Sequence, residues 1–263
     1  MNFEFSSDQM LLKDQARKFL EGEESVKKAR DVLEGDLVYD ESLWKSIIEM
    51  GFTATTIPEE YGGAGFGYLE LCVIAEEMGR SLAPTPFSSS VYLATEALLL
   101  HGSEEQKKNY LPKLSSGELI GTFAHNETTS SPSIENLKCE YNNGKLNGTK
   151  IAVPDGDIAS ISIVSAKEGD KVVLCVVNLS AEGVETVNQN TLDPSRSHAS
   201  ITFKNVESEI LGKGEDGWQN LQEVLDRAAV LFAFEQLGGA EACMNMAKEY
   251  ALGRFAFGRP IAS

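Results

Sequence analysis

The feature that most constrains the fold of this chain is a single β-rich block, residues 117–206, with helical sequence on both sides of it. Residues 142–144 in this block read Asn-Asn-Gly and separate two β-rich runs, 137–141 and 145–153. Asparagine and glycine tolerate the positive φ angles of a tight turn, so the two runs are predicted to form a hairpin. Because the remaining sequence is helical, we expect helical layers on either side of this β-unit.

A second hairpin is predicted from residues 158–166 and 171–179, which Glu-Gly-Asp at 168–170 separates. Residues 172–177 are apolar without a break, as is typical of a strand covered on both faces. Residues 200–206 supply one more β-rich run. We therefore expect an α+β fold with a small central antiparallel barrel or sandwich.

The sequence before the block carries the signals of several helices. Ser6 and Gln9 form a capping box ahead of a helix with one apolar face. Residues 58–67 read PEEYGGAGFG, which does not match the GxGxxG pattern of a dinucleotide-binding loop and follows no predicted strand. We interpret them as a tight turn that leads into a helix at residues 68–80.

The sequence after the block predicts one long helix. Over residues 218–252 almost nothing interrupts a helical pattern except Gly238 and Gly239, and residues 228–233 are apolar on every face. A helix of that kind has to be enclosed by other helices. Because the sequence ends at Ser263, we expect the rest of a C-terminal bundle to be missing from this chain or to come from another subunit.

Composition argues against some classes of partner. The chain has 23 Lys and Arg against 40 Asp and Glu, and a net charge of −17 disfavours binding to nucleic acid or to an anionic membrane surface. No apolar run reaches the roughly 18 residues of a membrane span, and the N-terminus lacks the pattern of a signal peptide. The four cysteines have no paired spacing, which favours reduced thiols, a cytoplasmic protein and no metal site.

Four segments, in this order, resemble the acyl-CoA dehydrogenase family, and the resemblance covers essentially the whole chain. They start at Pro58, Ala75, His101 and Tyr250 and read PEEYGG, AEEMGR, HGSEEQKKNYLPKLSSGE and YALGRFAFGRPI. The resemblance implies a helical N-terminal domain at residues 1–118, a central β-domain at 119–217 and the incomplete start of a C-terminal helical domain at 218–263. It also implies that FAD lies between the last two domains.

The resemblance further implies which β-domain residues contact ligands. The family shows an aromatic residue, two variable ones, Thr and Glu before a Gly-Ser-Asp-like turn, and Phe123, His125 and Asn126 fall in the matching run. All three are expected to bind FAD: His125 mainly through its backbone, and Asn126, in place of Thr, as a hydrogen-bond donor. Ser131 in the turn is the expected substrate contact, although the following Pro132 lacks a backbone N–H.

A second family motif, Gly-x-Lys-x-Trp-Ile-Ser/Thr, corresponds to residues 148–154. Ala152 stands where the family has the tryptophan that screens the flavin, and Pro154 stands where it has Ser or Thr. In these departures the chain resembles the partner-type subunits of heteromeric acyl-CoA dehydrogenases.

The glutamate that removes the substrate's α-proton in this family has no counterpart here. In most members it lies in a part of the C-terminal domain that this chain does not reach, and in others it would fall at Ala228. Asp226 and Glu235 are the nearest carboxylates, and the helix would have to shift by about half a turn to direct Asp226 inward. We therefore predict no catalytic residue, keep Asp226 as a candidate, and interpret both carboxylates as ordinary helix charges.

Arg254 and Phe257 match the family's RxxFG run, which reaches the FAD of a neighbouring subunit. A planar guanidinium suits the pyrophosphate because it can donate two parallel hydrogen bonds. The alternative is a solvated arginine near a helix end, where cations are common.

The resemblance implies FAD-dependent α,β-dehydrogenation of an acyl-CoA thioester in fatty acid or lipid catabolism. We expect a homo- or hetero-oligomer to carry out this reaction, and this chain on its own to be inactive. One alternative is a non-catalytic partner subunit of a heteromeric acyl-CoA dehydrogenase, which Ala152, Pro154 and the missing glutamate favour. The other is a flavin monooxygenase on the same fold, which fast reoxidation of reduced flavin by oxygen would distinguish.

Overall fold

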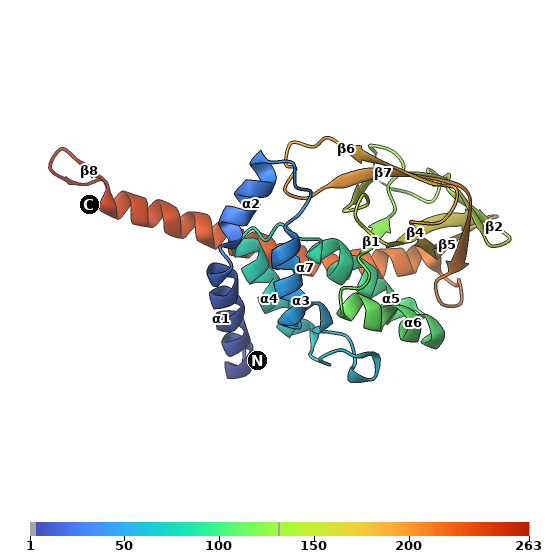
Figure 1. The fold of residues 1–263 in the computed structure, drawn as a ribbon, viewed down its shortest axis with the longest axis horizontal. Coiled ribbons are helices and arrows are strands. Elements are labelled where there is room, and N and C mark those ends of the chain that lie inside the picture. The colour runs from blue at the N-terminus through green and yellow to red at the C-terminus, as the bar shows by residue number, and fades with distance from the viewer. Residues whose placement is uncertain (1–3, 131, 263) are drawn as a thin grey trace.

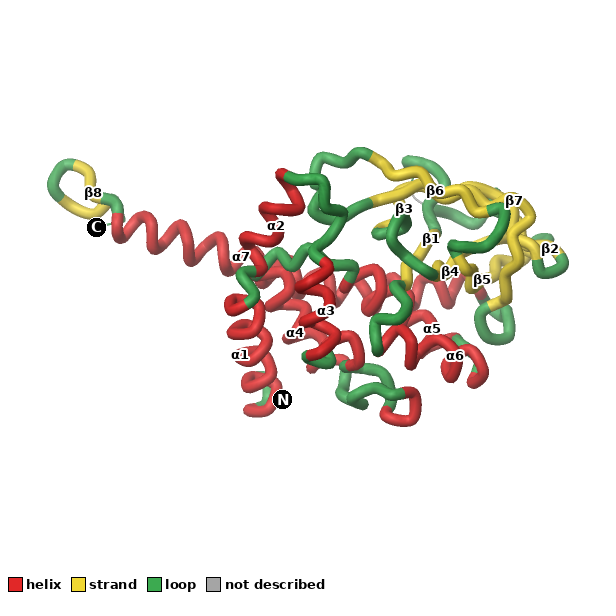
Figure 2. The backbone as a smooth tube through the Cα atoms, viewed as in Figure 1, coloured by secondary structure: helices red, strands yellow, loops and turns green. Residues whose placement is uncertain are grey.

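The computed structural model describes residues 4–130 and 132–262. Its helices and strands segregate into separate regions (Figures 1 and 2). The helical elements before the strands are α1 (Ser7–Gly22), α2 (Ser25–Glu34), α3 (Glu41–Glu49), η1 (Phe52–Ala54), η2 (Glu59–Tyr61), α4 (Tyr68–Arg80), the π-helix η3 (Ser88–Thr95), α5 (Glu96–His101) and α6 (Glu104–Ser115). The predicted Ser6–Gln9 capping box and the helix at 68–80 are confirmed.

The strands are β1 (Gly121–Ala124), β2 (Glu140–Asn142), β3 (Lys145–Pro154), β4 (Ile161–Glu168), β5 (Lys171–Asn178), β6 (Val184–Gln189) and β7 (His198–Ile210). The pairings run from β4 through β2, β3, β7 and β5 and back to β4, so these five strands close into a barrel. Both predicted hairpins are present, β2 with β3 and β4 with β5.

Two features of the barrel differ from the prediction. The pairings of β1 with β4 and of β2 with β4 are parallel, so the barrel is not purely antiparallel. The N-terminal helices and the long helix α7 (Gly217–Gly253) share one apolar core that includes residues of β1, β4 and β5, so the helices gather on one side of the barrel (Figure 1).

Strand β5 shows why residues 172–177 are apolar without a break. Leu174 and Val176 belong to the core shared with the helices, whereas Val173, Cys175 and Val177 belong to a second core inside the barrel. Successive side chains of a strand point to opposite faces, and here both faces are covered. The prediction of a strand buried on both faces is confirmed.

Helix α7 confirms the predicted long helix and has 37 residues, a length of about 55 Å. Gly238 does not interrupt it but lies where α7 crosses α4. A Cβ atom on Gly238 would lie 1.9 Å from the carbonyl oxygen of Glu76, and one on Gly79 would lie 2.0 Å from the carbonyl oxygen of Glu235. The two helices therefore approach so closely that neither glycine position has room for a side chain.

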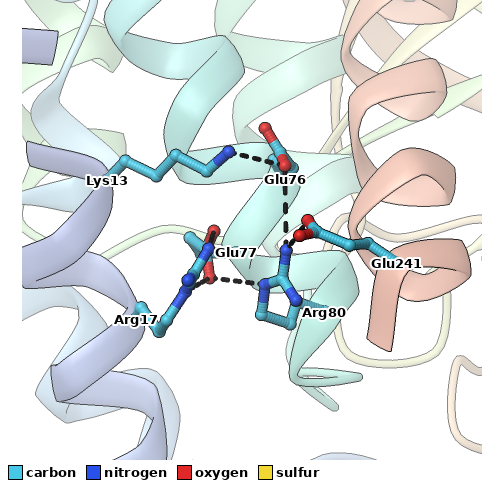
Figure 3. Close-up of polar contacts among 6 residues, drawn as sticks. All are labelled: Lys13, Arg17, Glu76, Glu77, Arg80 and Glu241. Atoms are coloured by element: carbon cyan, nitrogen blue, oxygen red, sulfur yellow. Dashed lines mark hydrogen bonds and ion pairs between the residues drawn. The ribbon is translucent and has the colours of Figure 1, made fainter. Parts of the chain in front are cut away.

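A charge-balanced cluster surrounds this crossing (Figure 3). It joins α1 to α4 and α4 to α7 through six side chains: Lys13, Arg17, Glu76, Glu77, Arg80 and Glu241. Lys13 Nζ lies 2.6 Å from Glu76, and the guanidinium of Arg17 donates two hydrogen bonds, of 2.8 and 3.0 Å, to the buried carboxylate of Glu77. The AEEMGR segment thus supplies three of the six charges and one of the two glycines of this helix junction.

The second half of α7 leaves the body of the molecule and ends in a small hairpin of β8 (Phe255–Ala256) and β9 (Arg259–Pro260) (Figure 1). Ala228 and Leu231 are buried, but Ala229, Val230 and Ala233 are exposed, so none of the described residues covers one side of the apolar stretch 228–233. None of the described helices combines the length and the apolar character needed to cross a membrane.

Candidate functional site

The structure brings Phe123, His125 and Asn126 together at the end of β1. The ring centroids of Phe123 and His125 lie 5.9 Å apart, and Phe123 is 1% exposed. The carbonyl of Asn126 accepts a hydrogen bond of 2.9 Å from the N–H of Ile151, which places this segment beside β3. Burial and the nearby ammonium of Lys150 lower the pKa of His125 to about 4, so its imidazole is neutral above about pH 5.

A buried ion pair lies beneath this segment. The ammonium of Lys150, whose side chain is 0% exposed, donates to Glu127 at 2.7 Å and to the hydroxyl of Ser165 at 3.1 Å. Glu127 follows Asn126 directly, so the pair fixes the chain just after the candidate cofactor-binding residues. Burial lowers the pKa of Lys150, which the nearby Glu127 carboxylate opposes.

Two adjacent hollows lie between the barrel and the N-terminal end of α7. The outer one has a volume of about 500 Å³ and is bordered by Lys171, Ile134 and the segment that leads into α7. The inner one is narrow, about 10 Å³, and is bordered by His125, Ser165 and Leu221. Trp218, the second residue of α7, borders both hollows. Sequence reasoning did not find Trp218 or Lys171, since neither belongs to a motif.

The predicted substrate contact Ser131 lies outside the described residues. Its neighbours Ser130 and Pro132 both border the inner hollow.

Ala152 lies where the pairing of β3 with β7 shifts its register, between Lys150 and Val153. Ala152 is exposed and has a φ of +50°, a conformation that alanine rarely adopts, and its N–H donates to the side chain of Gln189 at 3.1 Å. The carbonyl of Pro154 accepts a hydrogen bond from the hydroxyl of Thr122. No sequence signal points to the left-handed conformation at Ala152.

The structure does not place Arg254 and Phe257 with the other candidate residues. Arg254 caps the C-terminal end of α7, and Phe257 is fully exposed in the turn between β8 and β9. Figure 1 shows this hairpin and β1 in different regions of the molecule, with the projecting half of α7 leading away from the barrel.

The carboxylates of α7 do not reach the hollows. Asp226 is exposed and borders a separate surface depression with Tyr68 and Arg227, while Ala228 is buried. Glu235 is buried and contacts the guanidinium of Arg196 at 3.0 Å and the hydroxyl of Tyr92 at 3.1 Å. Among the described residues that border the inner hollow, Glu127 is the only carboxylate.

A second buried carboxylate lies at the end of β3, where the barrel meets η3. The hydroxyl of Ser89 donates to Asp155 at 2.5 Å, and the backbone N–H of Asp155 donates to the carbonyl of Ser197. Burial raises the pKa of Asp155 to about 6. No sequence motif indicates this junction, because its residues belong to three distant segments.

Asp155→Asn should change how stability depends on pH. The folded chain retains the Asp155 proton up to about pH 6, whereas the unfolded chain releases it near the ordinary pKa of 3.8. The contribution of Asp155 to the free energy of unfolding therefore falls as the pH rises between these values. Relative to the wild type, the variant should therefore gain about 2 kcal/mol between pH 4 and pH 7. Urea unfolding at both pH values measures this, and parallel pH profiles for the two proteins would contradict it.

Comparisons with known proteins identify relatives of this chain. Residues 6–118 match the family model of the acyl-CoA dehydrogenase N-terminal domain. Acyl-CoA dehydrogenase IpdE2 of Mycolicibacterium smegmatis is 31% identical, with 98% of this chain and 69% of that protein covered. The match spans 57% to 72% of the length of the curated relatives compared.

Two solved structures share the fold. The glutaryl-coenzyme A dehydrogenase complex with glutaryl-CoA has a TM-score of 0.91 at 27% identity and is covered to 71%, and the ChsE4-ChsE5 complex of Mycobacterium tuberculosis has a TM-score of 0.88 at 25% identity and is covered to 72%. Both matches cover 100% of this chain. With its motifs, fold and relatives in agreement, the chain belongs to the acyl-CoA dehydrogenase family.

Proposed function

We propose that this chain forms part of an FAD-dependent site for the α,β-dehydrogenation of an acyl-CoA thioester within an oligomer. The observation that carries the proposal is the pair of hollows that meet at Trp218. The wide outer hollow has room for part of coenzyme A, and Lys171 at its border can pair with a phosphate, whereas Asp170, Glu215 and Asp216 at the same border would repel one. The inner hollow beside His125, about 10 Å³, holds at most one water molecule, so its walls would have to move apart to admit the thioester arm.

The residues at the end of β1 fit FAD. Asn126 is half-buried and lies beside β3, and its side chain can donate a hydrogen bond. Phe123 is 1% exposed and packs in the core shared with the helices, so the half-buried His125 and Asn126 would hold the cofactor. When bound, FAD supplies the acceptor for the hydride that leaves the substrate's β-carbon.

Arg254 and Phe257 would serve FAD in a neighbouring subunit. Their exposure at the end of a projecting helix supports this assignment, since neither residue packs on the body of its own chain. The uncovered apolar side of α7 at Ala229, Val230 and Ala233 supports assembly with further helices.

A second candidate function is that of a non-catalytic partner subunit, and one observation favours it. Glu127, the only carboxylate among the described residues of the inner hollow, is fully engaged by Lys150 and by two backbone N–H groups. A carboxylate held in this way is not available as a base for the α-proton. The base would then come from another segment or another chain.

Binding and reduction experiments separate the two candidates. We expect butyryl-CoA to bind the purified chain in a calorimetric titration, coenzyme A to compete with it, and butyrate not to bind. Absence of binding by any CoA thioester would refute both candidates. Anaerobic addition of butyryl-CoA to the FAD-loaded oligomer then distinguishes them, because bleaching of the flavin absorbance requires a base in the assembled site.

A further inference from the structure

The carboxylate of Glu127 ties together the two ends of one loop. One oxygen accepts the backbone N–H of Lys138 at 2.6 Å, and the other accepts the backbone N–H of Cys139 at 3.0 Å. The segment between Glu127 and Lys138 supplies much of the wall of the inner hollow, including Thr128 and Leu137. A single side chain therefore closes the loop that shapes the narrow end of the candidate substrate site.

Lys150 neutralises this carboxylate from inside the barrel. Its ammonium can donate three hydrogen bonds, and three acceptors surround it: Glu127 at 2.7 Å, Ser165 at 3.1 Å and the carbonyl of His125 at 3.4 Å. Removing one member of a buried ion pair leaves the other charge without compensation, which is costlier than replacing both. The loop anchor thus depends on a residue of β3 that does not itself border the hollow.

We propose that Lys150 and Glu127 are positioning residues, which hold the described part of the loop between Glu127 and Lys138 in place beside the candidate acyl-CoA site. The inference rests on the proposed function for its ligand, but the anchoring of the loop can be measured without ligand. A role confined to overall stability would loosen the whole barrel. A positioning role loosens the loop first and weakens binding while the barrel stays intact.

The test uses Lys150→Met, Glu127→Gln and the double variant, with Lys145→Met as a matched control. Lys145 lies on the same strand and pairs with Glu207 at 2.9 Å on the surface, so its loss should change little. We expect Lys150→Met to weaken butyryl-CoA binding about tenfold and to speed hydrogen exchange of the loop amides, while the amides of residues 172–177 stay protected. Glu127→Gln removes one of the two acceptors that close the loop and leaves the ammonium of Lys150 uncompensated, so it should also speed exchange of the loop amides.

The double variant provides the rescue. It removes both buried charges and keeps the glutamine carbonyl as an acceptor for a loop amide, so it should recover part of the affinity that Lys150→Met loses.

Two outcomes would overturn the inference: wild-type loop exchange in Lys150→Met, or faster exchange throughout 172–177 without rescue by the double variant. If Lys150→Met does not fold, Glu127→Gln and the double variant are judged by the same readouts. A wild-type chain that does not bind butyryl-CoA would refute the proposed function, whereas the loop exchange would still decide the anchoring role.

Discussion

Gly238→Ala is expected to lower the free energy of unfolding by at least about 3 kcal/mol, a large effect for the addition of one methyl group. The new Cβ would lie 1.9 Å from the carbonyl oxygen of Glu76 and 2.9 Å from the backbone nitrogen of Arg80. These are backbone atoms of a buried helix and cannot turn aside as a side chain can. The helices α4 and α7 would have to separate, which would also pull apart the charge cluster around the crossing.

Gly239→Ala is the matched control for this substitution. The nearest atom to its added Cβ is the carbonyl oxygen of Gly79 at 3.5 Å, an ordinary van der Waals contact. Alanine favours a helix interior over glycine by about 1 kcal/mol, so this variant should be as stable as the wild type or more stable. Urea unfolding of both variants measures the difference, and equal stabilities would show that the crossing is not the tight contact described here.

Arg254→Ala is expected to weaken FAD retention by the assembled oligomer roughly tenfold to a hundredfold, the effect of losing one charge-assisted hydrogen bond. Folding should survive, since Arg254 is exposed at the end of α7 and contributes no side chain to either core. The thermal midpoint without flavin should therefore move little. Flavin fluorescence after gel filtration measures retention, and an unchanged flavin content would contradict the assignment.

Mixed oligomers show whether Arg254 contacts the FAD of its own chain or the FAD of a neighbouring chain. Half of the protomers carry Arg254→Ala, and the other half carry Asn126→Leu, which removes a donor from the FAD site. If Arg254 serves a neighbour, the sites with an intact Asn126 can receive an intact arginine from the other protomer, and flavin content should exceed that of either pure variant. Mixed oligomers that bind no more flavin than the pure variants would assign Arg254 to its own chain.

Local signals in the sequence were enough to predict several elements. The Asn-Asn-Gly turn forms with positive φ at Asn143 and Gly144, as these residue types favour, and residues 172–177 form a strand covered on both faces. The short strand β1 was missed because its parallel partner β4 lies about 40 residues away and four residues carry little pattern of their own. The exposed strand β6 was missed because it has no buried face to set an alternation.

Residues 88–101 form two kinds of helix in succession, the π-helix η3 and then α5. A π-helix and an α-helix differ by one residue in the span of their hydrogen bonds, and residue preference does not encode that difference.

The candidate site could be predicted only where its residues are adjacent in sequence. Phe123, His125 and Asn126 lie together because they follow one another along the chain. The pairing of Glu127 with Lys150 depends on the register of β3 within the barrel, which no spacing in the sequence specifies. The same applies to Asp155 and Ser89, which are 66 positions apart and meet only after the barrel docks on the helices.

The tight crossing of α4 and α7 has a mechanical consequence. From Gly238 to Arg254 the helix advances about 24 Å, so a change of about 10° in the crossing angle would carry the terminal hairpin sideways by about 4 Å. At the crossing, Gly79 and Gly238 bring the backbones of α4 and α7 into direct contact, so no side-chain rotamer can change there to accommodate a different crossing angle. The position of Arg254 relative to another molecule is therefore determined at the helix crossing, by Gly79, Gly238 and the charged side chains that surround them.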